Sequence, residues 1–194
     1  MSRKSITLSA LLLLLSACVS TEGLSEISTK PPKGNPSSAV TVETFSDLQC
    51  PACKRAHQLI VEPLLRRFPS EIVFHYRHFP LRSIHAYAVL SAEASECAAD
   101  QGKFWEYVAE TFLHQDALTK DDHRKRAANL GLDAPLFDRC LQSGIKRDIV
   151  MEEFAEGRKR SVNGTPTFFV NGRQVNSTLE DLREAIVTAL KATE

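Results

Sequence analysis

Two cysteines three residues apart stand where an extended segment gives way to a helix, and this junction restricts the fold more than any other feature. Residues 39–45 (AVTVETF) are mostly β-branched or aromatic, which predicts a strand. The CPAC segment at 50–53 follows, and apolar residues then recur at helical spacing up to residue 68. A cysteine pair at such a place can be a redox pair, half of a metal site or a structural disulfide.

The position of Cys50 at the expected helix start favours the redox interpretation. Backbone N–H groups are unpaired there and the helix dipole is positive, so a thiolate is favoured over a thiol. Cys53, one turn further along, is placed to attack a mixed disulfide at Cys50. Pro51 suits the first turn because its missing N–H costs little there. His57 extends the pattern to C-x2-C-x3-H, but a closed zinc site needs a fourth ligand, and we predict no metal.

The elements beyond this helix predict an α/β fold with a long interruption. Residues 71–79 (EIVFHYRHF) predict a second strand, so the chain begins β-α-β, with chemistry expected at the carboxyl ends of parallel strands. Residues 83–162 contain helical patterns only. Two short strands then flank Asn171-Gly172, a dipeptide suited to a hairpin turn, and an amphipathic helix follows from Thr178. A β-α-β piece and a β-β-α piece therefore flank a helical stretch.

Three motifs, in this order, resemble the DsbA-like thioredoxin-fold oxidoreductases, which are thiol-disulfide proteins of bacterial envelopes in which a helical domain interrupts a thioredoxin fold. They are FSD leading into CPAC at 45–53, ECA followed by QGKFW at 96–105, and GTPTFFVNG at 164–172. The resemblance covers about residues 34–192. It implies an α/β thioredoxin fold formed by residues 39–82 and 162–194 and interrupted by an all-helical insertion at 83–161.

The resemblance also implies a role for each residue of the site. Cys50 is expected to be the nucleophile, Cys53 the resolving thiol and Pro166 a cis-proline that faces the pair. A cis bond before Pro166 would leave Thr165 free to hydrogen-bond an extended substrate segment. The residues expected to contact substrate are Thr165, Pro51 and Ala52. No cofactor is expected beyond the cysteine pair.

Two residues depart from the family pattern. Ala52 stands where the strongest oxidants of this family carry His, and it offers the Cys50 thiolate neither charge nor a side-chain hydrogen bond. Less thiolate stabilisation implies a less oxidising disulfide. Thr44 stands where relatives usually keep a buried acid under the pair, and a shift of one residue along a strand would point Glu43 to the opposite face. Proton transfer at Cys53 is then left to water or another group.

The five cysteines have separate expected roles. Cys50 and Cys53 form the redox pair. Cys97 and Cys140, both within the insertion, are expected to form a structural disulfide. Two buried free thiols are the alternative for them, because their proximity cannot be read from the sequence. Cys18 then remains as the odd cysteine.

The N-terminal residues predict export and a lipid anchor. Residues 1–17 combine a basic start with an apolar run of signal-peptide length. LSAC at 15–18 resembles the bacterial lipobox, which implies cleavage before Cys18 and diacylation of that residue; ordinary cleavage nearby, with Cys18 incidental, is the alternative. Residues 18–38 are rich in Ser, Thr, Pro and Gly and predict a flexible tether.

The remaining aromatic and ionisable residues have structural interpretations. Phe104, Trp105 and Tyr107 are expected in the core of the insertion, and Asp47 in a loop or cap. His57 is also a candidate for tuning the pair. The other histidines are expected at surface or hydrogen-bonded positions: His75, His78, His85, His114 and His123.

These observations predict a lipid-anchored thiol-disulfide oxidoreductase that acts on cysteines of other exported proteins. The favoured direction is oxidation of dithiols. Disulfide reduction or isomerisation is the alternative, favoured by Ala52 and by Thr165, which also precedes the cis-proline in disulfide isomerases. A non-catalytic lipoprotein binding module is the alternative from a different class.

The expected partners follow from this function. They are exported proteins with free or mispaired cysteines, a membrane redox recycling protein and the lipid bilayer. Basic and acidic residues balance at 24 each, so the chain gives no sign of a nucleic-acid partner. We expect a monomer in the cell envelope, facing the periplasm or extracytoplasmic space.

Overall fold

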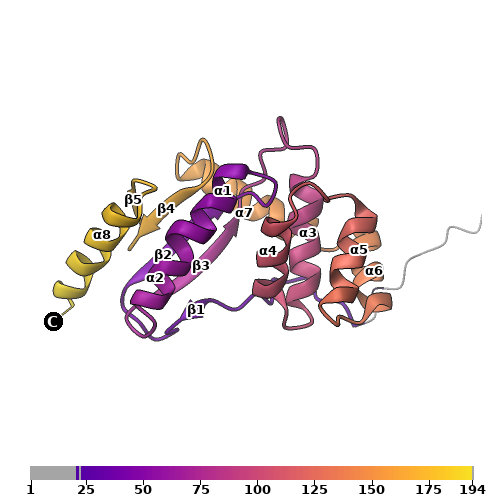
Figure 1. Cartoon of the computed structure of the whole chain (residues 1–194), viewed down its shortest axis with the longest axis horizontal. Helices are drawn as coiled ribbons and strands as arrows, with labels where there is room; N and C mark the ends of the chain where they lie inside the picture. Colours follow the sequence, from indigo (N-terminus) through magenta and orange to yellow (C-terminus); the bar gives the residue numbers. More distant parts are fainter. Residues whose placement is uncertain (1–20, 22, 194) are drawn as a thin grey trace, which may run out of the picture.

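The central sheet is built from strands that are far apart in the sequence. The computed structural model describes residues 21 and 23–193, and the strands in this part of the chain form one five-stranded sheet in the order β1-β3-β2-β4-β5 (Figure 1). They are β1 (Lys33–Gly34), β2 (Thr41–Ser46), β3 (Val73–His78), β4 (Thr167–Val170) and β5 (Arg173–Val175). β2 and β3 run parallel, and the other neighbouring pairs run antiparallel. The predicted β-α-β and β-β-α pieces therefore join in one sheet.

One interrupted helix connects β2 to β3. It comprises α1 (Pro51–Ala56), the π-helical turn η1 (His57–Val61) and α2 (Glu62–Arg67). The sequence predicts a kink or break at Pro63, which has no N–H for a helical hydrogen bond. The chain instead stays helical through Pro63, and the wider π turn lies directly before it. The altered hydrogen-bond spacing of that turn accommodates the missing donor.

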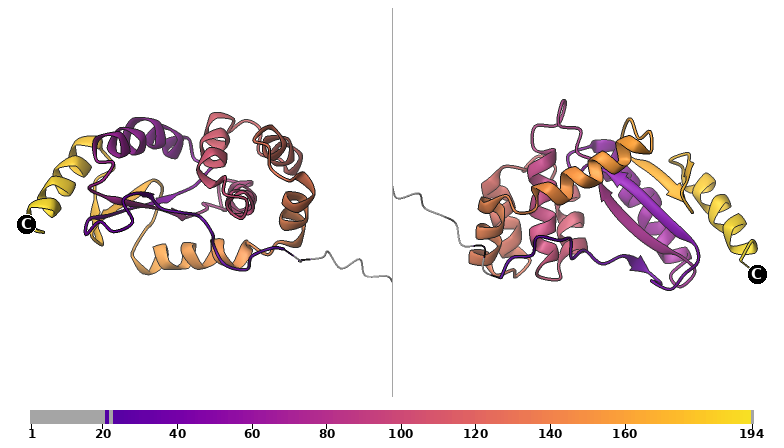
Figure 2. Two further views of the ribbon diagram at one scale, coloured as in Figure 1. Left: turned by 90° about the horizontal axis from the view of Figure 1, so that it is seen from below. Right: turned by 180° about the vertical axis from the view of Figure 1, so that it is seen from behind.

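Helices cover both faces of the sheet (Figure 2). On one face α1, α2 and α8 (Leu179–Lys191) pack over a core that includes Phe74. On the other face α7 (Arg147–Lys159) passes so close to Phe79 that a Cβ at Gly157 would lie 2.7 Å from that ring. α7, which lies within the predicted insertion of residues 83–161, therefore packs on this face of the sheet.

Four helices between β3 and α7 form the second part of the molecule (Figure 1). They are α3 (Ala88–Ala99), α4 (Phe104–Leu113), α5 (Lys120–Asn129) and α6 (Ala134–Ser143). Tyr107 and Phe137 pack in their core with ring centroids 5.6 Å apart. A disulfide joins Cys97 on α3 to Cys140 on α6, as the sequence predicts. Among the described residues, no helix has the length and apolar character that crossing a bilayer requires.

Residues 24–38 lie along the folded part, which corrects the flexible tether predicted for them. β1 pairs with β3. Trp105 Nε1 donates a hydrogen bond to the carbonyl oxygen of Pro31 (2.9 Å), and the buried Lys146 Nζ donates one to the carbonyl oxygen of Ile27 (3.1 Å). These contacts use backbone carbonyls and charged side chains, which apolar periodicity cannot reveal.

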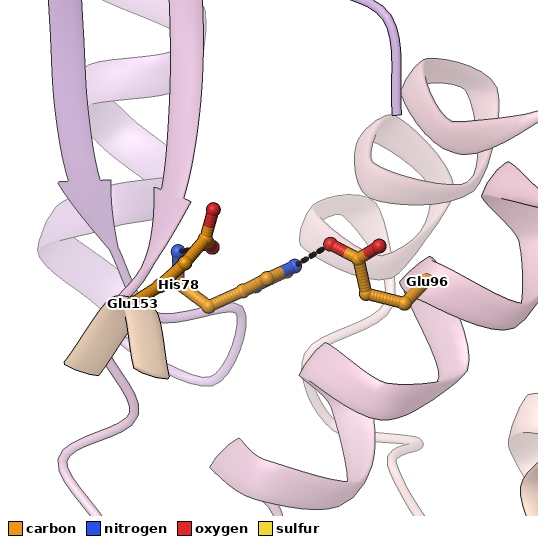
Figure 3. A group of neighbouring side chains, drawn as sticks. All are labelled: His78, Glu96 and Glu153. Atoms are coloured by element: carbon orange, nitrogen blue, oxygen red, sulfur yellow. Dashed lines mark hydrogen bonds and ion pairs between the residues drawn. The ribbon is translucent and has the colours of Figure 1, made fainter. Parts of the chain in front are cut away.

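Lys30 links this N-terminal segment to α3 and α7, and the carboxylates that it pairs with also contact β3. Its Nζ lies 2.7 Å from Glu96 Oε1 on α3 and 2.7 Å from Glu153 Oε1 on α7. Glu96 Oε1 also lies 3.0 Å from His78 Nε2 on β3, and the His78 backbone N–H donates to Glu153 Oε2 (2.7 Å; Figure 3). His78 and the two carboxylates are close enough to hold a cation, and the Lys30 ammonium supplies positive charge between these carboxylates.

Replacing Lys30 with Ala is expected to lower the free energy of unfolding by about 3–5 kcal/mol, because Glu96 and Glu153 would keep buried charges without this partner. Lys103→Ala is the matched control, since Lys103 and Glu106 form an exposed pair whose loss should change stability by less than about 1 kcal/mol. Urea unfolding at pH 7 measures both variants. Equal, small losses would contradict the linking role of Lys30.

Candidate active site

Cys50 lies at the start of α1, at the end of the loop that follows β2. Its backbone is extended (φ −73°, ψ 121°), and its carbonyl oxygen accepts a hydrogen bond from the Lys54 N–H (3.1 Å). Pro51 occupies the first turn, as predicted. Cys50 and Cys53 are free thiols, of which 6% and 1% is exposed. The structure thus places the predicted pair at the helix start, with Cys50 the more accessible sulfur.

Hydrogen bonds hold the pKa of Cys50 far below the usual thiol value. The largest contribution comes from the Cys53 thiol; the Thr165 side chain and the backbone N–H groups of Cys53 and Ala52 add to it, while burial opposes them. Together they lower the pKa of Cys50 to about 5. Burial, and then the hydrogen bond to Cys50, raises the pKa of Cys53 well above its usual range. At neutral pH the pair therefore consists of one thiolate and one thiol.

The Thr165–Pro166 peptide bond is cis and borders the pair, as the resemblance implies. The Thr165 carbonyl oxygen lies 3.5 Å from Cys50 Sγ and accepts a hydrogen bond when that sulfur is protonated. The Thr165 hydroxyl is buried beside the two sulfurs, on which it acts as a weak hydrogen-bonding group, and no described group meets it at full hydrogen-bond geometry. Ser177 Oγ donates to the Pro166 carbonyl oxygen (3.0 Å), which connects this turn to the start of α8.

An apolar groove of about 310 Å³ lies beside the pair. Its lining residues are Ala52, Arg55, Ala56, Leu59, Ile60, Pro166 and Ser177. Leu59 is 65% exposed and contributes apolar surface to this groove. The predicted substrate-contact residues Ala52 and Pro51 lie at this end of α1.

Asp47 organises the loop that carries Cys50. Its carboxylate accepts hydrogen bonds from the backbone N–H groups of Gln49 and Leu81 (2.8 Å each) and lies 2.7 Å from His85 Nδ1. Its backbone N–H lies 3.4 Å from Cys53 Sγ. The predicted loop role of Asp47 is confirmed, whereas its pairing with His85 was not foreseen.

Gln115 is a second site residue that the sequence does not reveal. It follows α4, and its Nε2 donates to the carbonyl oxygens of Leu48 (2.8 Å) and Cys50 (3.0 Å). Gln115 therefore ties the insertion to the loop that carries the nucleophile. No motif marks it, because Gln115 and Cys50 are 65 residues apart.

Thr44 lies beneath the pair, and Glu43 points away from it. Thr44 is buried and lines a cavity of about 10 Å³ together with Cys53. Glu43 lies on the other face of the sheet, with a carboxylate oxygen 2.9 Å from Arg160. Strand alternation explains this difference, so Glu43 supplies no carboxylate to the pair.

Two of the three aromatic residues predicted for the insertion core lie elsewhere. Phe104 packs with Cys53 and Tyr76, and its ring centroid is 5.6 Å from that of Tyr76. Trp105 also contacts Tyr76, at 6.2 Å between centroids. Only Tyr107 packs within the insertion core, as predicted. α4 therefore spans the boundary between the two parts, because its faces contact different layers.

In the reduced protein, Cys50 is expected to titrate near pH 5 while Cys53 stays protonated across the stable pH range. Iodoacetamide at pH 6 should therefore modify Cys50 and leave Cys53 unmodified, which peptide mass spectrometry can measure. Thiolate absorbance should show the same midpoint, and Cys50→Ser should remove it. A midpoint near about 8.5, the usual thiol value, would contradict the proposed asymmetry.

Comparison with solved structures places this arrangement among known proteins. A thioredoxin-like oxidoreductase from Silicibacter pomeroyi DSS-3 matches with a TM-score of 0.75 and 27% identity, over 84% of this chain and 93% of that chain. The thiol-disulfide exchange protein alpha-DsbA2 from Wolbachia pipientis matches with a TM-score of 0.71 and 20% identity, over 82% of this chain and 87% of that chain.

Comparison of sequences finds partial matches to longer curated proteins and a match to one family profile. The Na(+)/H(+) antiporter NhaA 3 of Salinispora tropica is 35% identical over 159 residues, which are 81% of this chain and 24% of that protein. The chain thus spans about a quarter of the length of the curated relatives it matches. The thioredoxin family profile matches residues 27–188. With its Cys50–Cys53 pair beside a cis-proline, the chain belongs to the thioredoxin family and has the DsbA-like fold of thiol-disulfide oxidoreductases.

Proposed function

We propose that this protein oxidises dithiols in other exported proteins by exchanging a Cys50–Cys53 disulfide with them. The low pKa of Cys50 carries the proposal. A stabilised thiolate favours the reduced form of the pair, and a pair that favours its reduced form oxidises other thiols. Ala52 adds only its backbone N–H to this stabilisation, so the pair should be less oxidising than one with His at that position.

The exchange transfers two electrons from substrate to protein. A substrate thiolate attacks Cys50 Sγ, the bond between Cys50 and Cys53 breaks, and Cys53 leaves with the electron pair and takes up a proton. A second substrate thiolate then attacks the substrate sulfur of the mixed disulfide, and Cys50 leaves as its stabilised thiolate. The substrate gains a disulfide. A membrane redox protein is the proposed partner that reoxidises the dithiol.

The groove beside Cys50 supports an unfolded or extended protein segment as the substrate. Leu59 and Ala52 present apolar surface, and Pro166 lines the same groove. The Thr165 hydroxyl provides a polar group at the edge of the pair. An extended segment would combine main-chain hydrogen bonds with one apolar contact, and would bring its cysteine to Cys50.

Disulfide reduction or isomerisation is the second candidate direction, and Ala52 favours it. Its methyl side chain offers the Cys50 thiolate no hydrogen bond, so the reduced form is stabilised only by Cys53, Thr165 and backbone groups. A non-catalytic binding module would not need this stabilisation, since a structural disulfide works without a reactive thiolate. We therefore rank catalysis by the pair above binding alone, and propose that the protein acts as a monomer.

We further propose that a diacyl group on Cys18 holds the protein at a membrane of the cell envelope. Cys18 lies outside the described residues, and the LSAC pattern at 15–18 supports this proposal. Two acyl chains are sufficient for stable anchoring, whereas one chain gives reversible binding. The catalytic domain would then face exported proteins.

Oxidised protein is expected to introduce a disulfide into a peptide with two cysteines, and Cys50→Ser should abolish this activity. Mixed with the disulfide form of the peptide, Cys53→Ser should accumulate a mixed disulfide between the peptide and Cys50, because the Cys50 thiolate displaces one peptide sulfur as a thiolate and the resolving thiol is missing. The potential of the pair, measured against glutathione, decides the direction. A redox potential above about −200 mV would support the oxidase direction. A potential near that of thioredoxin, about −270 mV, together with reduction of peptide disulfides, would overturn the proposed direction.

Cys18→Ser is expected to move the protein from the detergent phase to the aqueous phase after cell extraction. The matched control is Cys50→Ser, which leaves the LSAC pattern intact and should stay in the detergent phase. Incorporation of labelled fatty acid should parallel the partitioning. Unchanged partitioning of the Cys18 variant would contradict the anchor.

A further inference from the structure

The proton on Cys53 presents a chemical problem that the pair alone does not solve. Burial raises the pKa of Cys53 well above its usual range, and only 1% of the residue is exposed. Each turnover nevertheless requires Cys53 to lose a proton when it attacks and to gain one when it leaves. The neighbouring Asp47 backbone N–H can hydrogen-bond to the sulfur but cannot accept its proton.

A cavity beside Cys53 provides a place for a proton carrier. Its volume of about 10 Å³ is close to what one water molecule needs. Thr44, Ser46 and Tyr76 contribute polar side chains to its lining. The Tyr76 hydroxyl is fully buried beside the Ser46 side chain, and no described group meets it at full hydrogen-bond geometry. Buried hydroxyl groups are normally hydrogen-bonded, so this one indicates a bound water.

His57 is the residue of this lining that can exchange a proton near neutral pH. It follows Cys53 by four residues, so both side chains lie on the same helix face, and both line the cavity. Burial raises the pKa of Tyr76 well above 10, and the hydroxyl groups of Thr44 and Ser46 do not titrate. His57 also begins the π turn η1, a helix irregularity that is frequent at functional sites.

The surroundings of His57 connect the cavity to solvent. Its ring packs on Phe112 of α4, with centroids 5.2 Å apart, and its side chain is 11% exposed. On the outer side, Nε2 lies 3.6 Å from Glu62 of α2, whose carboxylate also pairs with Lys33 of β1. Burial, opposed by Glu62 and assisted by Lys33, lowers the pKa of His57, which keeps the ring neutral and able to accept a proton.

We propose that His57 exchanges the proton of Cys53 through one water held in this cavity. When Cys53 attacks a mixed disulfide, the Cys53–Cys50 bond forms, the bond from Cys50 to the substrate sulfur breaks, and the substrate leaves as a thiolate. The Cys53 proton passes to the water, and the water gives a proton to His57. In the reverse step, protonated His57 returns a proton to the Cys53 sulfur through the same water. The proposal rests on thiol-disulfide exchange at the pair and not on its direction.

The test follows a glutathione adduct on Cys50. Reduced protein is mixed with excess oxidised glutathione, quenched with acid and analysed by mass spectrometry. Trp105, the one tryptophan of the chain, lines the same cavity and gives a parallel fluorescence signal. His57→Gln is expected to slow the decay of the adduct about 100-fold at pH 7, the lower range for general acid–base catalysis. The variant's rate should keep rising with pH to about pH 9, because hydroxide replaces the lost base.

A second variant separates proton transfer from a structural role. Adding Thr44→Asp to the His57→Gln protein places a carboxylate in the lining of the same cavity. The adduct on this double variant should decay at least tenfold faster than the adduct on His57→Gln alone. His114→Gln is the control at an exposed helix end and should leave the decay unchanged. Thermal unfolding should show that each variant folds.

Two results would overturn the role of His57. One is an adduct that decays as fast in His57→Gln as in wild type. The other is a slowed decay that keeps the wild-type pH profile and is not recovered by Thr44→Asp, which would indicate a packing role. Failure of the oxidase proposal is distinguishable, because wild type would then resolve the glutathione adduct normally and still not oxidise the dithiol peptide.

Discussion

The burial of Cys53 beneath the first turn of α1 controls most of the chemistry at this site. A thiol removed from water keeps its proton, and the Cys53 thiol can then donate its hydrogen bond to the Cys50 sulfur. If both sulfurs were equally exposed, both would titrate near about 8.5 and neither would be the preferred nucleophile. The same burial means that Cys53 requires a nearby proton acceptor. His57, which lines the same cavity, is the proposed acceptor.

The position of the pair depends on contacts from both parts of the molecule. Asp47 joins the loop before Cys50 to the segment after β3, and Gln115 joins it to the end of α4. The insertion that carries Gln115 is in turn held to β3 by the contact between Glu96 and His78, and to the N-terminal segment by the ion pair between Glu96 and Lys30. Packing of the N-terminal segment therefore contributes to the geometry around Cys50.

Local patterns predicted the elements that carry the chemistry. The cysteine spacing placed Cys50 at a helix start, and strand alternation correctly pointed Glu43 away from the pair. The same reasoning erred for residues 24–38, because Lys30 lies in a polar segment whose stability comes from two distant carboxylates. It also placed Trp105 in the insertion core, since an amphipathic pattern identifies a buried face without saying which layer buries it.

The sequence by itself determined the redox pair and the order of strands and helices after residue 38, because each depends on residues within a few positions of one another, and the resemblance of its motifs implied the cis-proline. The tertiary structure alone decided which groups surround Cys53. Thr44, His57 and Tyr76 come from β2, η1 and β3, and they meet only when the parallel strands pair and the connecting helix packs over them. Side-chain contacts between elements depend on the packing of the whole chain, so no local spacing encodes them.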